Sequence, residues 1–240
     1  MKQENSSILT FDYTKLDVLF EDNHLLLVNK PCGIMVQPDK AGNRSMEDVA
    51  KDYITYKYNK PGNAFIGIPH RLDRPVSGVL MLCKTSKALV RFNEMLRNRE
   101  VQKTYWAVVE NKPAIEEDTL IHWLRKSESS NMSKAFLSEV KGSSRCELAY
   151  KYLRSSQYYH LLEVNPKTGR HHQIRVQLSF MGCPIKGDDK YGAKRGNRDL
   201  SIHLHARQLE FIHPVTKVPM TVIANPNLED KVWAALTDLK

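Results

Sequence analysis

Short apolar runs separated by turn-forming residues constrain the fold of this chain most. Runs such as Leu25–Val28 and Gly78–Leu82 have the length of one buried strand, and they are far shorter than the roughly 18 residues of a membrane helix. Several such runs alternate with three or four segments of helical periodicity, and no repeat of fixed period or low-complexity linker is present. The sequence therefore predicts one mixed α+β domain without a membrane segment.

The expected elements follow from local composition and periodicity. We predict strands at 25–30, 78–83, 103–109, 145–153, 158–164, 206–211 and 218–223, because these stretches are apolar, aromatic or β-branched. Helical spacing predicts helices after Ser45, over 86–99, over 172–180 and at the C-terminus after Asn227 as N-cap. The Ser- and Lys-rich stretch 125–145 predicts a long hairpin or a mobile surface loop.

The charge balance favours a polyanionic partner. The chain has 36 Lys+Arg against 27 Asp+Glu, a formal net charge of +9. Basic residues concentrate at 91–99, at 167–170 and at 186–198, and such clusters bind phosphates through counterion release. A merely solubilising surface is the alternative.

The cysteines and the N-terminus indicate a reduced compartment. Cys32, Cys83, Cys146 and Cys183 form no C-x-x-C pair, which argues against a zinc knot or a disulfide framework. The polar start of the chain does not have the pattern of a signal peptide. We therefore expect a cytoplasmic protein.

The segment His70–Gly78 places a carboxylate between two arginines. Asp73 lies between Arg71 and Arg74 on a loop bounded by Pro75 and Gly78, just before a predicted strand. Nearby guanidinium groups favour the ionised carboxylate, which can act as a nucleophile or a base. A purely structural Arg/Asp pair is the alternative.

A second polar segment, Thr168–Arg175, combines a turn with a predicted helix start. It presents Arg170, His171, Gln173 and Arg175, and arginines near helix N-terminal amides favour a phosphate or a carboxylate. A solvated basic turn is the alternative.

These segments, in this order, resemble the motifs of the RluA-like family of RNA pseudouridine synthases. His70–Gly78 is similar to the catalytic motif, Lys103–Val109 to the tyrosine motif, and Leu162–Arg175 with Gly182–Gly192 to the arginine motif. The strand Leu204–Pro214 also resembles the family pattern, and the resemblance runs from about Leu19 to about Ile223.

The resemblance implies a fold, a reaction and residue roles. The fold would be the pseudouridine synthase catalytic fold, with a mixed, mostly antiparallel central sheet flanked by helices and loops. Asp73 would be the catalytic aspartate, Arg175 its ion-pair partner, Tyr105 the ring that stacks on the target uracil, and Arg71 the side chain that enters the base stack. The partner would be tRNA or rRNA, the protein a monomer, and no cofactor or metal would be needed.

The chemistry fits these residue types. Isomerisation breaks the glycosidic bond, turns the uracil while it is held, and joins C5 to C1′. A carboxylate can attack C1′, remove a sugar proton or add to the base, and the sequence does not choose among these routes. The ring of Tyr105 can hold the detached base and its hydroxyl can relay the C5 proton. Flipping the uridine out of its RNA leaves a gap in the base stack, which the Arg71 side chain can fill.

Further RNA contacts are predicted from charge and from proximity to the motifs. They are Arg74, Lys84, Lys103, Arg170, His171, Gln173, Lys194 and Arg195.

Two departures from the family pattern matter. Val76 stands where the family usually has Thr, so a hydroxyl contact is missing. Fewer than twenty residues precede the strand at Leu19, whereas many relatives carry a small N-terminal RNA-binding domain. The expected organisation is an extension over 1–18 and a catalytic domain over 19–240, similar to the short branch of the family, some members of which act on tRNA.

Three alternatives stay open. A catalytically silent RNA-binding protein would keep the fold and the basic face. A hydrolase with an aspartate nucleophile would need a second carboxylate, for which Asp188 and Asp189 are candidates. A metal site would draw on His70, His171, His172, His203 and His205, although two histidines on one strand face more often pack.

The remaining aromatic and glycine signals favour structural roles. Trp106 and Trp123 can stack on RNA, but their positions on a strand and before a basic loop favour packing. The Gly187–Gly192 spacing lacks the Lys-Ser/Thr of a nucleotide-binding loop, which disfavours ATP.

Overall fold

The computed structural model describes residues 11–39, 41–62, 64–127 and 129–238. These residues form two compact units, one from residues up to Gln102 with Gln208–Ala224 and the other from Lys103–Arg207 with the chain from Asn225 onward. The first ten residues of the predicted extension 1–18 lie outside the described residues, and a 3-10 turn at Tyr13–Lys15 precedes the first strand.

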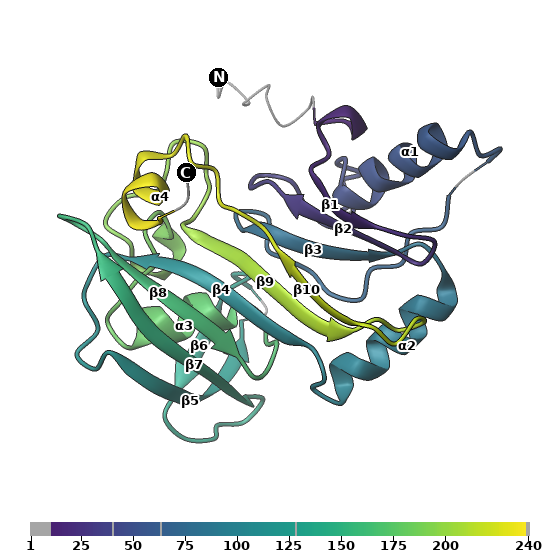
Figure 1. The fold of residues 1–240 in the computed structure, drawn as a ribbon. Helices are drawn as coiled ribbons and strands as arrows, with labels where there is room; N and C mark the ends of the chain where they lie inside the picture. Colours follow the sequence, from purple (N-terminus) through teal and green to yellow (C-terminus); the bar gives the residue numbers. More distant parts are fainter. Residues whose placement is uncertain (1–10, 40, 63, 128, 239–240) are drawn as a thin grey trace. The chain divides into compact units, whose positions relative to one another are not determined.

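The first unit is a sheet covered by two helices (Figure 1). Its strands are β1 (Val18–Glu21), β2 (Leu25–Lys30), β3 (Ser77–Cys83), the second part of β9 (Leu204–Ile212) and β10 (Pro219–Ile223). The pairs β1–β2, β2–β3 and β9–β10 are antiparallel. The helices are α1 (Met46–Tyr58) and α2 (Ser86–Arg97).

Both helices form where capping and periodicity predict them. Ser45 and Asp48 make a reciprocal capping box at the start of α1, which satisfies two N–H groups of the first turn. Thr85, one residue before the predicted start, caps α2. The apolar stripe of α2 packs on one face of β2 and β3, with Phe92 edge-on to Phe211 at 5.4 Å between ring centroids.

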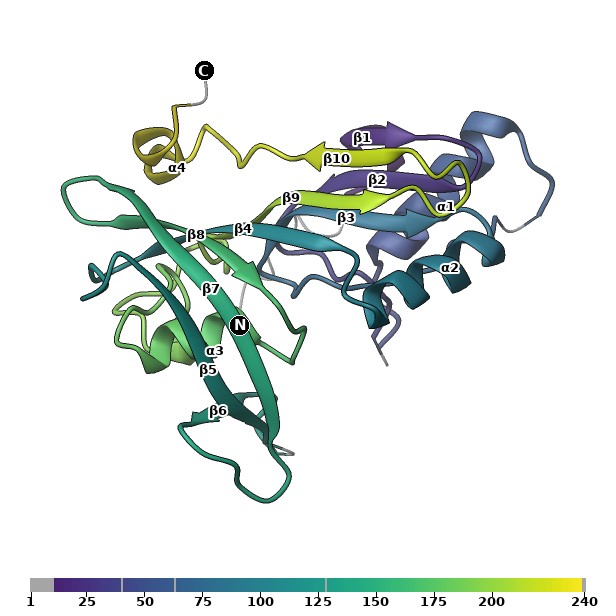
Figure 2. The same ribbon diagram turned by 60° about the horizontal axis from the view of Figure 1, so that its bottom comes forward.

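The second unit holds a sheet in the order β4–β8–β7–β5–β6 (Figure 2). The strands are β4 (Gln102–Val109), β5 (Glu117–Lys126), β6 (Ser133–Phe136), β7 (Ser144–Ser155) and β8 (His160–Pro166), all paired antiparallel. Helix α3 (Gln173–Phe180) packs on one face of this sheet. Helix α4 (Lys231–Leu236) packs on Val108 and Leu161. A short 3-10 turn, Asp189–Tyr191, follows α3.

The predicted N-cap of the C-terminal helix was wrong. Asn227 is not the N-cap of α4, because Asp230 accepts the Val232 and Trp233 N–H groups while Asn227 closes the turn before it. Of the two alternatives predicted for 125–145, the hairpin is confirmed, because β6 forms within this stretch and pairs antiparallel with β5. The sequence analysis also missed most of β5 (Glu117–Lys126).

The fold class is confirmed as α+β with a mixed, mostly antiparallel sheet. Since β9 runs from the second unit into the first, the chain continues in extended form between them. The single catalytic domain over 19–240 stays a prediction. No helix among the described residues is long and apolar enough to cross a membrane.

Candidate active site

Asp73 lies on a loop of the first unit whose neighbouring apolar side chains are anchored in the core. Leu72 and Val76 are 6% and 2% exposed, whereas Asp73 is half-buried and Arg71 and Arg74 are exposed. The Val76 N–H donates to the Asp73 carbonyl at 3.0 Å, which closes a turn. Burial of Val76 explains why an apolar side chain is accepted where the family usually has Thr.

A buried lysine fixes this loop from behind. The Lys30 ammonium is 0% exposed and donates to the carbonyls of Pro31, Ile34 and Arg74 at 2.9, 2.8 and 3.3 Å. The Gly33 N–H also donates to the Arg74 carbonyl, and Arg74 Nε returns a hydrogen bond to the Gly33 carbonyl, both at 2.8 Å. We call these contacts the loop clamp. It ties the residue after Asp73 to the end of β2.

Lys30 is expected to make stability depend on pH. Burial lowers the pKa of Lys30 to about 7, although the charge of Asp73 opposes this shift. Since the unfolded chain keeps this proton up to about pH 10, stability rises with pH above 7. The wild type should gain about 2 kcal/mol over Lys30→Met between about pH 7 and pH 9. Urea unfolding of both proteins across this range measures the gain, and a difference that is flat with pH would contradict it.

Tyr105 lies in the second unit, in the middle of β4. It is half-buried and pairs with Val164 of β8, which in turn pairs with Tyr150 of β7. These residues share the face of the sheet that α3 covers, since the neighbouring inward side chains Leu124 and Cys146 pack on Val176 of α3. The aromatic ring that the resemblance assigns to uracil thus lies on the same face as Arg175.

Arg175 is held by a carboxylate and a ring that the sequence did not connect to it. Its Nε and Nη2 donate to the two oxygens of Asp188, both at 2.7 Å, and the two side chains are 5% and 1% exposed. The guanidinium carbon lies 5.0 Å from the centre of the Tyr191 ring. A guanidinium has five N–H donors, so this pair is compatible with the expected role toward Asp73.

The turn before α3 is built by Gln173 rather than left open for a ligand. The side-chain oxygen Oε1 of Gln173 accepts from Thr168 Oγ1 at 2.8 Å and from the Arg170 N–H at 3.0 Å, and its Nε2 donates to the backbone carbonyl of Glu147. Because Gln173 is 4% exposed, it shapes the turn, whereas Arg170 is exposed on it. Gln173, which the sequence predicts to contact RNA, thus makes its hydrogen bonds within the protein.

Two stacked histidines complete the surroundings of Arg175. The rings of His171 and His172 lie 3.8 Å apart, and His172 begins α3 with a φ of 54°. Ser133 of β6 contacts His171 Nδ1 through its hydroxyl at 3.0 Å and donates its N–H to Tyr191 Oη at 2.8 Å. His171 is half-buried, so it is less open to RNA than its motif position suggests.

The basic loop after Asp188 is folded around a glycine. Gly187 has a φ of +86°, and an added Cβ would lie 2.5 Å from Asn197 Nδ2 and 2.9 Å from the Ser201 carbonyl. The Asn197 amide holds the loop through Lys186 and Ser201. Lys194 and Arg195 are exposed on it, as expected for phosphate contacts.

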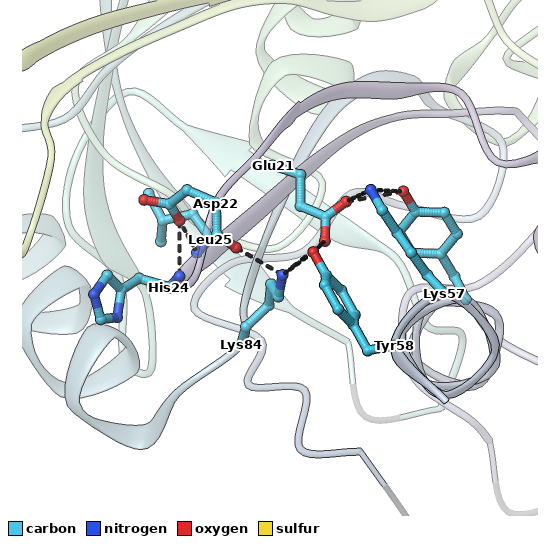
Figure 3. A network of polar contacts seen from close by, with 8 residues as sticks. Glu21, Asp22, His24, Leu25, Lys57, Tyr58 and Lys84 are labelled. Carbon is cyan, nitrogen blue, oxygen red and sulfur yellow. Dashed lines mark hydrogen bonds and ion pairs between the residues drawn. The ribbon is translucent and has the colours of Figure 1, made fainter. Parts of the chain in front are cut away.

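Lys84 has an internal partner where the charge pattern predicted a phosphate contact (Figure 3). Its ammonium donates to Glu21 Oε1 and to the Asp22 carbonyl, both at 2.6 Å, and the Lys84 side chain is 8% exposed. The Tyr58 ring covers it at 4.6 Å. Burial alone would raise the pKa of Glu21, but hydrogen bonds from its neighbours lower it to about 2; these are Lys57, Lys84, Tyr58 and Tyr53.

Lys84→Met is therefore expected to change stability and not RNA binding. Losing one cation of a buried ion pair should cost about 2 kcal/mol, because the other donors to Glu21 remain. Urea unfolding at neutral pH measures this loss. The salt dependence of RNA binding should match that of the wild type, and a smaller slope would return Lys84 to the phosphate contacts.

The remaining sequence candidates are placed as follows. Burial lowers the pKa of Lys103, which is half-buried at the start of β4. The Arg207 guanidinium covers the Trp106 ring at 4.4 Å, in line with packing. His203 lies against Trp233 and 3.2 Å from Asp230. Within the described part of the chain, no group of three or more His, Cys, Asp or Glu is placed to hold a metal ion.

Known proteins match this chain over most of its length. Residues 24–180 match the RNA pseudouridylate synthase family. The ribosomal large subunit pseudouridine synthase C of Buchnera aphidicola subsp. Schizaphis graminum is 33% identical over 92% of this chain and 72% of its own length. The tRNA pseudouridine synthase C of Vibrio cholerae serotype O1 is 31% identical over 92% of this chain and 94% of its own length.

A solved structure supports the fold. Human RNA Pseudouridylate Synthase Domain Containing 4 superposes with a TM-score of 0.76 at 24% identity, over 92% of each chain. On the strength of the family match and the curated relatives, the chain belongs to the RNA pseudouridylate synthase family, as its RluA-like motifs predict.

Proposed function

We propose that this protein converts specific uridines of tRNA or rRNA to pseudouridine, with the Asp73 carboxylate as the reacting group. The observation that carries the proposal is that the region matching the family, residues 24–180, contains Asp73, Tyr105 and Arg175 together. The relatives are named for tRNA and for the ribosomal large subunit, so both RNA classes are candidate substrates.

Each residue has a distinct part in the reaction. The bond between C1′ and N1 breaks, the uracil turns, C5 joins C1′, and the C5 proton leaves while N1 gains one. Asp73 starts this sequence at the sugar or at the base. Tyr105 offers a ring face to the detached uracil, which has no covalent tether at that stage. Arg175, oriented by Asp188, is the proposed ion-pair partner of the Asp73 carboxylate.

Exposed cations bind the RNA in this proposal. Arg71 fills the gap left by the flipped uridine, and phosphates are bound by Arg74, Arg170, Lys194 and Arg195, all of which are exposed. Lys84, Lys103, His171 and Gln173 contribute less, because the protein itself buries or half-buries them. The protein would act as a monomer in the cytoplasm.

Tritium release from RNA labelled at uracil C5 tests the proposal. Unmodified tRNA transcripts and a large-subunit rRNA transcript are offered separately, in the presence of EDTA because the chemistry needs no metal. Release from one RNA class is expected and names the substrate. If neither RNA releases tritium although both bind, the protein is a catalytically silent RNA-binding member of the family.

A further inference from the structure

The face of the second unit's sheet that points away from α3 carries a group of cations and aromatic rings. On β5, His122 and Leu124 are buried toward α3, where His122 meets Phe180 and Leu124 packs on Val176. Since side chains alternate along a strand, Trp123 and Arg125 point to the opposite face. We call this group the outer strip; it comprises Trp123 and Arg125 of β5, Lys134 and Phe136 of β6, and Arg145 of β7.

The register of the strands brings like charges together in the outer strip. Arg125 lies directly opposite Lys134, and Trp123 lies opposite both Phe136 and Arg145. Like charges directly across an antiparallel pair destabilise it. Arg125, Lys134 and Arg145 are all exposed. The isolated protein therefore keeps an unfavourable arrangement at this place.

Carboxylates compensate little of this charge. In the described ranges, no carboxylate forms an ion pair with Arg125 or Lys134. The Arg125 guanidinium instead lies 5.2 Å from the centre of the Phe136 ring. Arg145 shares its charge with Glu147 at 3.0 Å. An external polyanion would relieve the repulsion.

We propose that the outer strip is a second RNA-binding surface, on which two adjacent phosphates contact Arg125 and Lys134 and a base stacks on Trp123. The proposal rests on the proposed function in taking the substrate RNA as the partner. Neighbouring cations fit successive phosphates of one strand, and exposed aromatic faces beside them fit unpaired bases. The half-buried Trp123 ring provides such a face, whereas the Arg125 guanidinium covers the Phe136 ring.

The edge strand β6 connects the outer strip with the surroundings of Arg175. Ser133 faces inward, where it contacts His171 and Tyr191, and the next residue, Lys134, faces outward. Since β6 is the last strand of the sheet in this unit, RNA that leaves the Arg175 side over this edge reaches the outer strip directly. A structured RNA would thus be held on both faces of one edge.

The test compares two double variants that remove the same charge. Arg125→Ala/Lys134→Ala should weaken binding of tRNA and rRNA transcripts about tenfold at low salt and reduce the salt slope of log K by about two. The control, Lys112→Ala/Lys151→Ala, removes two cations of the same unit that are paired with Glu116 and Glu117. The control should bind as the wild type does. Equal behaviour of the two double variants would overturn the proposal.

A third variant separates stacking from charge. Trp123→Leu should weaken binding several-fold and leave the salt slope unchanged, because it removes a ring face and no cation. Unchanged affinity of Trp123→Leu would refute the stacked base. Urea unfolding checks that each variant folds.

Turnover distinguishes failure of this proposal from failure of the proposed function. The Arg125→Ala/Lys134→Ala protein should need about tenfold more RNA than the wild type to reach half of its maximal rate of tritium release. Wild-type protein that binds RNA through the outer strip without releasing tritium would refute the catalytic function alone. If the wild type releases tritium and the outer-strip variants bind RNA as tightly as the wild type does, this inference alone is refuted.

Discussion

Asp73→Asn is expected to abolish pseudouridine formation while RNA affinity stays within a few-fold of that of the wild type. The amide keeps the shape of the side chain on the loop but has neither the charge nor the nucleophilicity of the carboxylate. Loss of such a group lowers kcat by at least about a thousandfold. Tritium release under single-turnover conditions, with enzyme in excess over RNA, measures the effect.

The loop clamp makes the Asp73 experiment interpretable. The hydrogen bonds from Val76, Gly33 and Lys30 end on the backbone carbonyls of Asp73 and Arg74, which the substitution keeps. Asp52→Asn is the matched control, because Asp52 is an exposed partner of Arg44 in the same unit. Turnover of Asp73→Asn near that of this control would refute Asp73 as the reacting group.

Asp188→Asn is expected to have the largest combined effect on stability and turnover. Asp188 holds two N–H groups of the buried Arg175 guanidinium in one plane, and an amide offers only one acceptor oxygen to them. Replacing the carboxylate of a buried ion pair should cost about 3 kcal/mol. We also expect kcat to fall about a hundredfold with little change in RNA affinity, because the orientation of Arg175 is lost.

The neighbouring carboxylate provides the control for Asp188. Asp189 is exposed in the same turn, so Asp189→Asn makes the same chemical change without touching Arg175. Urea unfolding and single-turnover tritium release are measured for both variants, and Asp188→Glu should recover part of the rate. If Asp188→Asn loses stability but keeps the wild-type kcat, Asp188 supports the fold alone.

The elements that were predictable from the sequence are those whose signals are local. The α2 and α3 positions follow from apolar residues at helical spacing, and the Ser45 capping box follows from two residues three apart. The predicted N-cap of α4 was wrong because Asn227 and Asp230 are equally suited to an N-cap position. Asp230 differs in reaching His203, a contact that only the folded chain creates.

The sequence predicted the motifs of the site, but it did not predict the residues that hold those motifs in place. In the sequence, Lys30 is an ordinary lysine at the end of a predicted strand. Its hydrogen-bond partners are backbone carbonyls, which no sequence pattern identifies. Asp188 was considered as a second carboxylate for hydrolysis, whereas the structure pairs it with Arg175. Lys84 has the same charge as a phosphate contact, and only Glu21 beside it changes that interpretation.

The loop clamp decides when the reactive loop loses its conformational freedom. Fixing the backbone of one residue costs about 1–2 kcal/mol in conformational entropy, and hydrogen bonds from Lys30, Gly33 and Val76 fix the segment around Asp73 within the first unit. That entropy is lost once, when the chain folds, and not at each encounter with RNA. Binding energy from the RNA is then left for unstacking the uridine, which has to leave its helix before any bond can change.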